Sequence, residues 1–223
     1  MSRSFKSVLA SFGALALISA AASAAHAADA IPYPNSGSYN TTTYSFTATA
    51  TGDVIAYFIG GSGAGFENQM GLLDNGVLTS AGFGLDNHSS AVGDSFNLGS
   101  VNAGDTLVFV LHNLSLGADA FSDPSLNAAY DSPGETLGHN HIYSTGYTAD
   151  PTIASVPVGT YVAFEDLPFP GADFNYNDES FVFTNATVGP GVPEPSTWAM
   201  MLMGLGGLGA VVRGARRRQA AVA

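Results

Sequence analysis

Hydrophobic residues in the central part of the chain recur at every second position, which is the period of a β-strand. Between residues 41 and 52, Tyr44, Phe46 and Ala48 alternate with threonine and serine. Runs of β-branched and aromatic residues, bounded by Gly, Asp or Asn, follow at 53–61, 105–114, 159–166 and 180–188. No stretch between 28 and 191 has the pattern of a long amphipathic helix. The periodicity therefore predicts an all-β chain.

Turn signals between these runs are frequent and favour antiparallel pairing. Asn75-Gly76 is a dipeptide typical of a two-residue hairpin, and segments 102–106 and 157–161 contain further turn residues. We therefore expect residues 28–191 to form one exported domain, an antiparallel β-sandwich with a jelly-roll-like order. The threonine row at 41–51 predicts the solvent-facing side of an edge strand.

The N-terminal segment has the features of a secretory signal peptide. Arg3 and Lys6 precede an apolar stretch at 8–22, and the small residues Ala25 and Ala27 then supply a cleavage site. A permanent membrane anchor is the alternative, but the apolar run is short for that role. The sequence predicts a cleavable signal peptide over residues 1–27.

The charge distribution restricts the classes of function. All 6 basic residues lie near the two ends, whereas all 18 acidic residues lie between Ser7 and Val212. A nucleic-acid-binding protein needs a cationic surface, so this class is excluded. The carboxylates of the body must be hydrated, hydrogen-bonded or neutralised by cations, because the body has no Lys or Arg. The chain also has no Cys, so disulfides do not stabilise it.

The C-terminal segment carries the remaining basic residues. Pro193, Glu194 and Pro195 are followed by an apolar run at 198–212, for which we expect a short transmembrane helix. A helix needs about 20 residues to cross the hydrocarbon core, so this run is of marginal length. Arg216, Arg217 and Arg218 complete a cluster that should stay on the cytoplasmic side.

Residues 192–218 closely resemble the PEP-CTERM sorting signal that exosortases recognise. The Pro-Glu-Pro, the Ser-Thr-Trp-Ala that follows it, the short apolar helix and the terminal Arg cluster stand in the order of that signal. The resemblance implies a Gram-negative, exopolysaccharide-producing bacterium and cleavage near Pro193–Pro195. It implies transient anchoring in the inner membrane, processing by an exosortase-type enzyme, and delivery to the cell surface or biofilm matrix, with exopolysaccharide as a candidate partner.

An acidic segment at 165–183 contains the candidate chemistry of the body. Asp173, Asn175 and Asn177 alternate with Phe174 and Tyr176, so an extended chain would place oxygens on one face and rings on the other. Ca²⁺ takes six to eight oxygen ligands from carboxylates, amides, backbone and water. The segment is either a solvated acidic loop or a calcium site. The candidate ligands are Glu165, Asp166, Asp173, Asn175, Asn177 and Asp178.

Residues 126–188 resemble an uncharacterised bacterial domain family with the signature F-E-D-L, a Gly-rich spacer and D-x-D-Y-N-D. Residues 164–167 match the first half, and Asp173, Tyr176, Asn177 and Asp178 match the second. That family occurs in exosortase-sorted proteins and surface adhesins. The resemblance implies that this segment binds calcium in a structural role. Asn175 stands where the family usually has Asp, so one carboxylate fewer implies weaker affinity.

The remaining candidates for chemistry favour a non-catalytic protein. His139 and His141 could form a transition-metal pair, but no third ligand is identifiable, and hydrogen-bonded structural histidines are the preferred interpretation. A carbohydrate-active hydrolase would need paired carboxylates such as Glu165 and Asp166, yet neighbouring strand residues point to opposite faces. A carbohydrate-binding module is the other alternative. Its candidate stacking rings are Tyr143, Tyr147, Tyr161 and Phe169.

Overall fold

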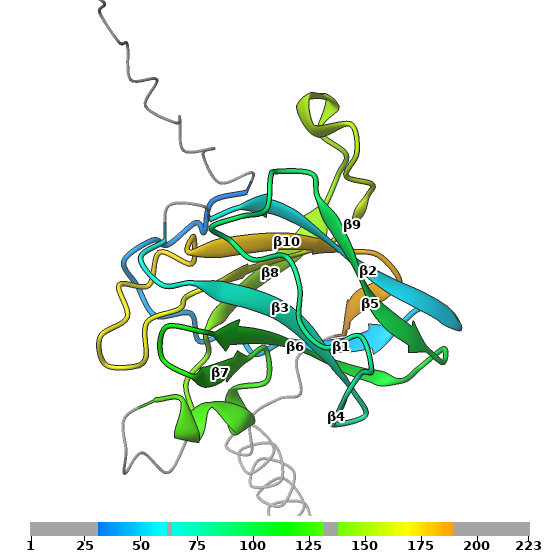
Figure 1. Cartoon of the computed structure of the whole chain (residues 1–223). Helices are drawn as coiled ribbons and strands as arrows, with labels where there is room; N and C mark the ends of the chain where they lie inside the picture. Colours follow the sequence, from blue (N-terminus) through cyan, green and yellow to red (C-terminus); the bar gives the residue numbers. More distant parts are fainter. Residues whose placement is uncertain (1–30, 62–63, 132–137, 190–223) are drawn as a thin grey trace, which may run out of the picture.

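The computed structural model describes residues 31–61, 64–131 and 138–189, and these form two antiparallel sheets (Figure 1). Sheet A has the strand order β11-β1-β6-β3-β4, and β7 pairs with β6 beside this path. Its strands are β1 (Ser45–Ala48), β3 (Asn68–Asp74), β4 (Val77–Leu78), β6 (Thr106–Asn113), β7 (Ala118–Phe121) and β11 (Ala186–Gly189).

Sheet B has the order β5-β2-β10-β9-β8. Its strands are β2 (Gly52–Gly60), β5 (Ser95–Val101), β8 (Ile142–Tyr147), β9 (Gly159–Phe164) and β10 (Glu179–Phe183). Two short 3₁₀ helices lie in the connections, η1 (Pro124–Ala129) and η2 (Pro151–Ile153). Both begin with Pro after an Asp whose side chain accepts a hydrogen bond from the first turn, which is the capping pattern expected there.

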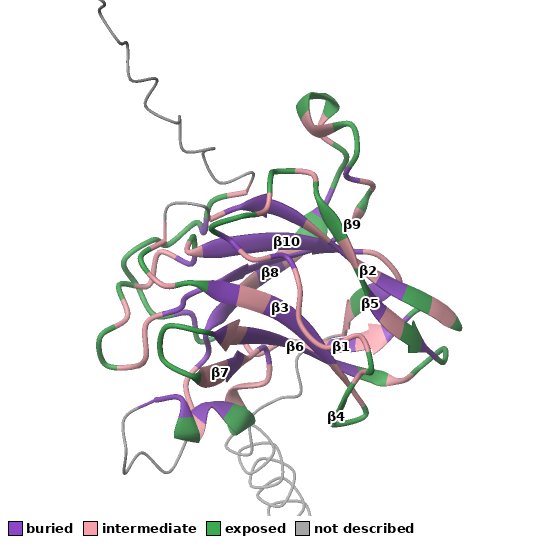
Figure 2. Ribbon diagram, in the orientation of Figure 1, coloured by how far each residue is buried: buried purple, intermediate pink, exposed green. Residues whose placement is uncertain are grey.

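The main core lies between the two sheets. Phe109 of β6 stacks on Phe183 of β10 with ring centroids 3.7 Å apart, and Phe46 of β1 packs edge-on against Phe109 at 4.9 Å. Buried residues run along the strands, and exposed residues lie mainly in the connecting loops and strand ends (Figure 2). The alternating apolar residues that predict strands are therefore the residues that join sheet A to sheet B.

The outer face of sheet B has a second, smaller core. Tyr161 and Val182 point away from the first core and pack with Tyr33, Tyr147 and other buried residues of the flanking segments. Tyr33 lies edge-on to Tyr176, which belongs to the loop between β9 and β10, at 4.9 Å between ring centroids. This second core fixes the β9–β10 loop against sheet B.

The all-β, antiparallel prediction is confirmed. The hairpin prediction is confirmed as well, because Asn75 and Gly76 join β3 to β4 with φ of 48° and 83°. The edge-strand prediction for the threonine row was wrong: β1 lies between β11 and β6, and Thr47 pairs with Thr187 and Thr106. The jelly-roll order stays a prediction. The signal peptide at 1–27 and the helix at 198–212 lie outside the described residues.

Candidate functional site

A layer of polar side chains closes one end of the main core. On β3, Met70 and Leu72 face this core, and Asn68 continues their alternation by one step. The same continuation holds at the neighbouring strand ends, where a polar residue extends each inward-facing apolar row. The resulting inner polar layer consists of Asn68, Asn113, Asn140, Asp166 and Glu179, all at most 4% exposed.

Asn68 ties the two sheets together within this layer. Its Nδ2 donates to Asp166 Oδ2 at 2.9 Å and to Glu179 Oε1 at 2.5 Å. Asn113, the cross-strand partner of Asn68, donates from Nδ2 to the hydroxyl of Tyr130 at 3.1 Å. One neutral amide therefore serves two buried carboxylates, which leaves their negative charge unbalanced.

Several buried oxygens at this end of the protein have no hydrogen bond of normal geometry among the described residues. They are both carboxylate oxygens of Glu165, Oε2 of Glu179 and Oδ1 of Asn68. Buried polar atoms in folded proteins are nearly always hydrogen-bonded, and all of these atoms are acceptors once the carboxylates are ionised. The site therefore lacks a donor or a cation.

Burial shifts the titration of these acids upward. Desolvation, followed by repulsion from the Asp173 carboxylate, raises the pKa of Glu165 to about 7. Desolvation, followed by repulsion from Asp166, raises the pKa of Asp178 to about 8. The pKa of Glu179 lies well above its usual range, and that of Asp166 is also raised, in both cases chiefly because the group is buried. Each ionised carboxylate here is costly without a positive partner.

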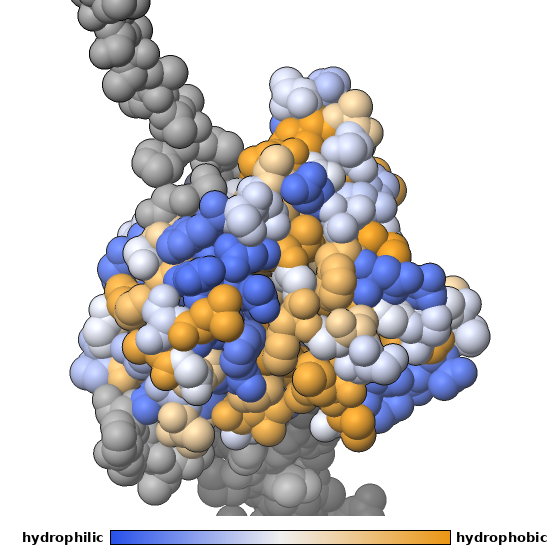
Figure 3. Space-filling model, in the orientation of Figure 1, coloured by the Kyte–Doolittle hydropathy of each residue, from blue (hydrophilic) through white to orange (hydrophobic). Residues whose placement is uncertain are grey.

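The structure brings four of the six candidate ligands together. Glu165 and Asp166 follow β9, and Asp178 lies directly before β10, with its Oδ2 accepting from the Asp166 N–H at 2.9 Å. Asp173, farther along the same loop, lies close enough to raise the pKa of Glu165. Hydrophilic residues form one patch left of the centre of the molecule and another at its right in Figure 3, and the β9–β10 loop lies at the left of the molecule in Figure 1.

The other two candidates, Asn175 and Asn177, form successive turns. Asn175 Nδ2 donates to Asp173 Oδ2 at 2.8 Å, and the Asn175 Oδ1 accepts from the Asn177 N–H at 3.0 Å. The expectation of an extended chain here was wrong, because Phe174 and Tyr176 have φ of 58° and 53°. Side chain-to-backbone hydrogen bonds of this kind compete with extended structure and hold the left-handed residues.

Asp131 and the two histidines form a separate, internally neutralised cluster. Asp131 accepts from His141 Nε2 at 2.9 Å, His139 Nδ1 at 3.1 Å and the Phe169 N–H at 2.9 Å. Burial alone would raise the pKa of Asp131, but these hydrogen bonds outweigh it and hold that pKa well below its usual range. The prediction of structural, hydrogen-bonded histidines is confirmed.

His141 links this cluster to the end of β9. Its second ring nitrogen, Nδ1, faces the Glu165 carbonyl oxygen at 2.9 Å. Both ring nitrogens thus face acceptors, and both hydrogen bonds form together only in the doubly protonated imidazolium. The carboxyl groups of Glu165, Asp166, Asp178 and Glu179 face no Lys or Arg, because the body of the chain has none.

Two residues of the site were missed as candidate ligands, Asn68 and Glu179. Glu179 belongs to the acidic segment, but it stands at the start of a strand and was assigned no role. The alternation of side chains along a strand could have found both residues. Glu179 lies two residues before Phe181, and Asn68 lies two residues before Met70, so each faces the main core as Phe181 and Met70 do.

The residues fit a hard cation better than a soft one. The available donors are carboxylate and amide oxygens, which suit Ca²⁺ or Mg²⁺. Among the described residues, no group of three or more His, Asp or Glu side chains is placed to hold a metal ion. Carboxylates repel one another without an ion, so a cation bound here would also use amide or backbone oxygens and draw the acids inward.

The aromatic residues near the site are arranged differently from the predicted stacking set. Tyr161 and Tyr147 are 0% and 5% exposed, so their rings cannot stack on a sugar. Phe169 of the predicted set and three further rings form a closed chain of contacts at the acidic end, with centroid distances from 3.7 to 6.2 Å. These rings are Tyr39, His139, Phe169 and Phe174, and each is partly exposed.

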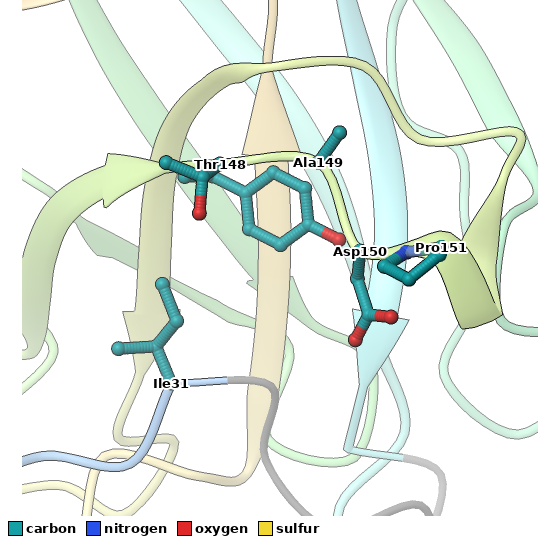
Figure 4. Close-up of a pocket in the computed structure, with 6 residues that line it drawn as sticks. Ile31, Thr148, Ala149, Asp150 and Pro151 are labelled. Atoms are coloured by element: carbon teal, nitrogen blue, oxygen red, sulfur yellow. The ribbon is translucent and has the colours of Figure 1, made fainter.

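A pocket elsewhere on the protein contains none of the candidate ligands. It has a volume of about 360 Å³ and is lined by Ile31 and the segment 147–151 (Figure 4). Asp150 lies in its wall, but Oδ1 of this carboxylate already accepts from the backbone and hydroxyl of Thr152, both at 2.7 Å. The pocket thus offers no paired carboxylates for glycoside hydrolysis.

The signals predicted from the sequence lie at the two ends of the chain. Within the part of the chain that the structure describes, no helix has the length and apolarity needed to cross a membrane. The sorting residues Pro193–Pro195 and Arg216–Arg218, and the cleavage residues Ala25 and Ala27, lie outside that part.

No curated protein and no solved structure matches the chain. Residues 191–218 match the PEP-CTERM protein-sorting motif, which identifies an exported protein that an exosortase sorts to the cell surface.

Proposed function

We propose that the chain is a non-catalytic surface or extracellular-matrix protein, a β-sandwich whose acidic end is stabilised by calcium. Its transient anchor in the inner membrane is the C-terminal apolar helix, and its final location is the envelope or matrix of an exopolysaccharide-producing Gram-negative bacterium.

The observation that carries this proposal is the set of buried oxygens without donors. Glu179 Oε2, in a residue that is 0% exposed, has no partner, and the two oxygens of Glu165, which is 1% exposed, make no hydrogen bond of normal geometry although the Asp173 backbone N–H lies close to them. A solvated acidic loop would leave its carboxylates in water, so the burial of these groups favours a bound cation over that alternative.

In this proposal the calcium ion stabilises the fold. Glu165 follows β9, and Asp173 and Asp178 lie in the loop before β10, so an ion held by these carboxylates would fasten the loop that joins two neighbouring strands of sheet B. Because only the folded protein has this binding site, calcium stabilises the folded state more strongly as its concentration rises.

Calcium titration of the purified exported protein tests the proposal. Isothermal titration calorimetry should show saturable calcium binding, and Asp173→Ala or Asp178→Ala should remove or strongly weaken it. Asp53→Ala is the matched control, because Asp53 is exposed on β2 and bonds to Asn97 and Ser100 away from the loop. Equal calcium binding by all of these variants would contradict the proposal.

Carbohydrate binding is the second candidate function, favoured by the four partly exposed rings beside the acidic loop. Aromatic side chains present apolar faces that pack against the C–H faces of sugars. A polysaccharide screen with the wild type and Tyr39→Ala tests it. Binding without release of shorter glycans, lost in the variant, would support a binding module, whereas cleavage of the glycan would support a hydrolase.

A further inference from the structure

Glu165 and Asp166 lead to opposite faces of sheet B. Along β9, Ala163 belongs to the outer core and Phe164 to the core between the sheets. Because the side-chain period of a strand is two, Glu165 continues the outer row and Asp166 the inner row. The contacts agree with this. Glu165 lies near enough to raise the pKa of Tyr176 in the outer core, whereas Asp166 bonds to Asn68 of sheet A.

The inner group consists of acceptors that face one another. Asn68 Nδ2 lies between Asp166 Oδ2 and Glu179 Oε1, and Asn68 Oδ1 and Glu179 Oε2 are left without partners. Asp86, at the loop that follows β4, adds further negative potential at Glu179. A half turn of the Asn68 amide exchanges its NH₂ group for its oxygen, which would give three converging oxygen donors from three segments.

The outer group has its own unpartnered oxygens. Both oxygens of Glu165 are buried without a hydrogen bond of normal geometry, and the backbone N–H and the carboxylate of Asp173 are their neighbours in the loop. Asp178 lies between the two groups, since its Oδ2 is bonded to the backbone N–H of Asp166. The backbone of β9 and its extension therefore separates two sets of uncompensated oxygens.

We propose that the acidic end binds two divalent cations of the calcium class, one on each face of sheet B. The outer ion is held by Glu165 and Asp173 and fastens the β9–β10 loop. The inner ion is held by Asn68, Asp166 and Glu179 and joins sheet A to sheet B at the end of the main core. This inference rests on the proposed calcium binding and adds a second site that unites the sheets.

Native mass spectrometry of the exported protein with calcium chloride tests the number of ions. The wild type should bind two calcium ions, and Glu179→Gln and Glu165→Gln should each bind one. The double variant should bind none, and Asp53→Asn should keep both. Glu179→Gln keeps the side-chain shape and removes a buried charge, so in chelator its melting temperature should equal or exceed that of the wild type. Asp166→Asn serves as a second inner variant.

The outcomes separate the two proposals. One calcium ion in the wild type, lost in both Glu179→Gln and Glu165→Gln, would overturn the two-site inference and leave the proposed function standing. Retention of two ions by both Glu179→Gln and Asp166→Asn would overturn the proposed inner site. No calcium in the wild type would overturn the inference and the proposed function together.

Discussion

The side-chain amide of Asn68, on β3 of sheet A, donates a 2.9 Å hydrogen bond to the carboxylate of Asp166, which follows β9 of sheet B. The two residues are 98 positions apart in the sequence. Their contact is buried and lies at the end of the core where five strand ends carry inward polar residues. The sheets are thus joined here by polar contacts, in contrast to the aromatic packing along the rest of the interface.

Removing the Asn68 side chain should destabilise the protein. Asn68→Ala takes away the donor shared by Asp166 and Glu179 and leaves buried carboxylates unpaired, at a cost of roughly 1–3 kcal/mol. Urea unfolding in chelator measures this loss. Asn97→Ala, which removes the exposed hydrogen bond to Asp53, is the control and should change stability by about 0.5 kcal/mol or less. Equal losses in both variants would contradict the role given to Asn68.

Calcium-free protein should lose stability as the pH rises from 5 to 9. The pKa values of Glu165 and Asp178 are raised from 4.5 and 3.8 to about 7 and about 8. A raised carboxyl pKa means that the folded state holds its proton more tightly than the unfolded state. The corresponding stability is complete below about pH 4 and is lost as the pH passes through 7 to 8.

Melting curves in chelator across this pH range measure the effect, and millimolar calcium should flatten the decline because it replaces the protons. The double variant Glu165→Gln, Asp178→Asn should show a weaker decline in chelator. Asp131 affects the folding stability in a different pH range. Its lowered pKa contributes stability above about pH 4, and this contribution is lost in stronger acid. A melting temperature that rises from pH 5 to 9 in chelator would be inconsistent with this electrostatic arrangement.

Gly61 should be intolerant of any side chain. A Cβ at this position would lie 2.0 Å from the Asp178 carbonyl oxygen and 2.5 Å from the Glu179 Cα, and its φ is +109°. Gly61→Ala should push the start of β10 away and weaken calcium binding. Gly104→Ala is a matched control, because Gly104 also has a positive φ but has nothing within 4 Å of the added Cβ.

Thermal unfolding of the two glycine variants separates conformational strain from the contact. Both lose the freedom of a glycine at positive φ, so the difference between them reports the clash, which should amount to about 1–3 kcal/mol. If Gly61→Ala were as stable as Gly104→Ala, the close approach of Gly61 to Asp178 would have no structural importance.

Processing should occur at both ends of the chain. Intact-mass analysis of the surface or secreted form should show loss of about the first 27 residues and of the Arg tail, because each end carries its own signal. Deletion of the exosortase in the producing bacterium should leave the C-terminal segment attached. A mature surface protein that still carries Arg216–Arg218 would contradict the sorting mechanism.

The predictability of the strands follows their local pattern. β2, β6, β9 and β10 lie within long apolar runs, and each was predicted from residue type and period alone. β5 and β7 were missed because they are interrupted by polar residues or short, as in Ser95–Val101, where Asn97 and Gly99 weaken the apolar row. The position of β1 inside sheet A depends on pairing with β6 and β11, which no local pattern reveals.

The acidic loop was visible as a cluster of like charges, but its partners on other strands were not. Asn68 is the first residue of β3 and a single ordinary amide, and its contact with Asp166 exists only because the two sheets stack. The turns around Asn175 were also hidden, because alternating polar and aromatic residues suit an extended chain as well as successive turns. Extending the inward-facing row of each strand by one step of two residues, from Met70 and from Phe181, would have found Asn68 and Glu179.

The melting temperature of the exported protein in chelator and in calcium tests the central claim most directly. Calcium at one hundred times its Kd should stabilise the fold by about 2.7 kcal/mol, so the melting temperature should rise by several degrees. Magnesium, which demands a tighter octahedron, should raise it much less. Asp178→Ala should reduce the rise strongly, and Asp53→Ala should retain it. A melting temperature that stays unchanged from chelator to millimolar calcium would contradict the account and return residues 165–183 to a solvated acidic loop.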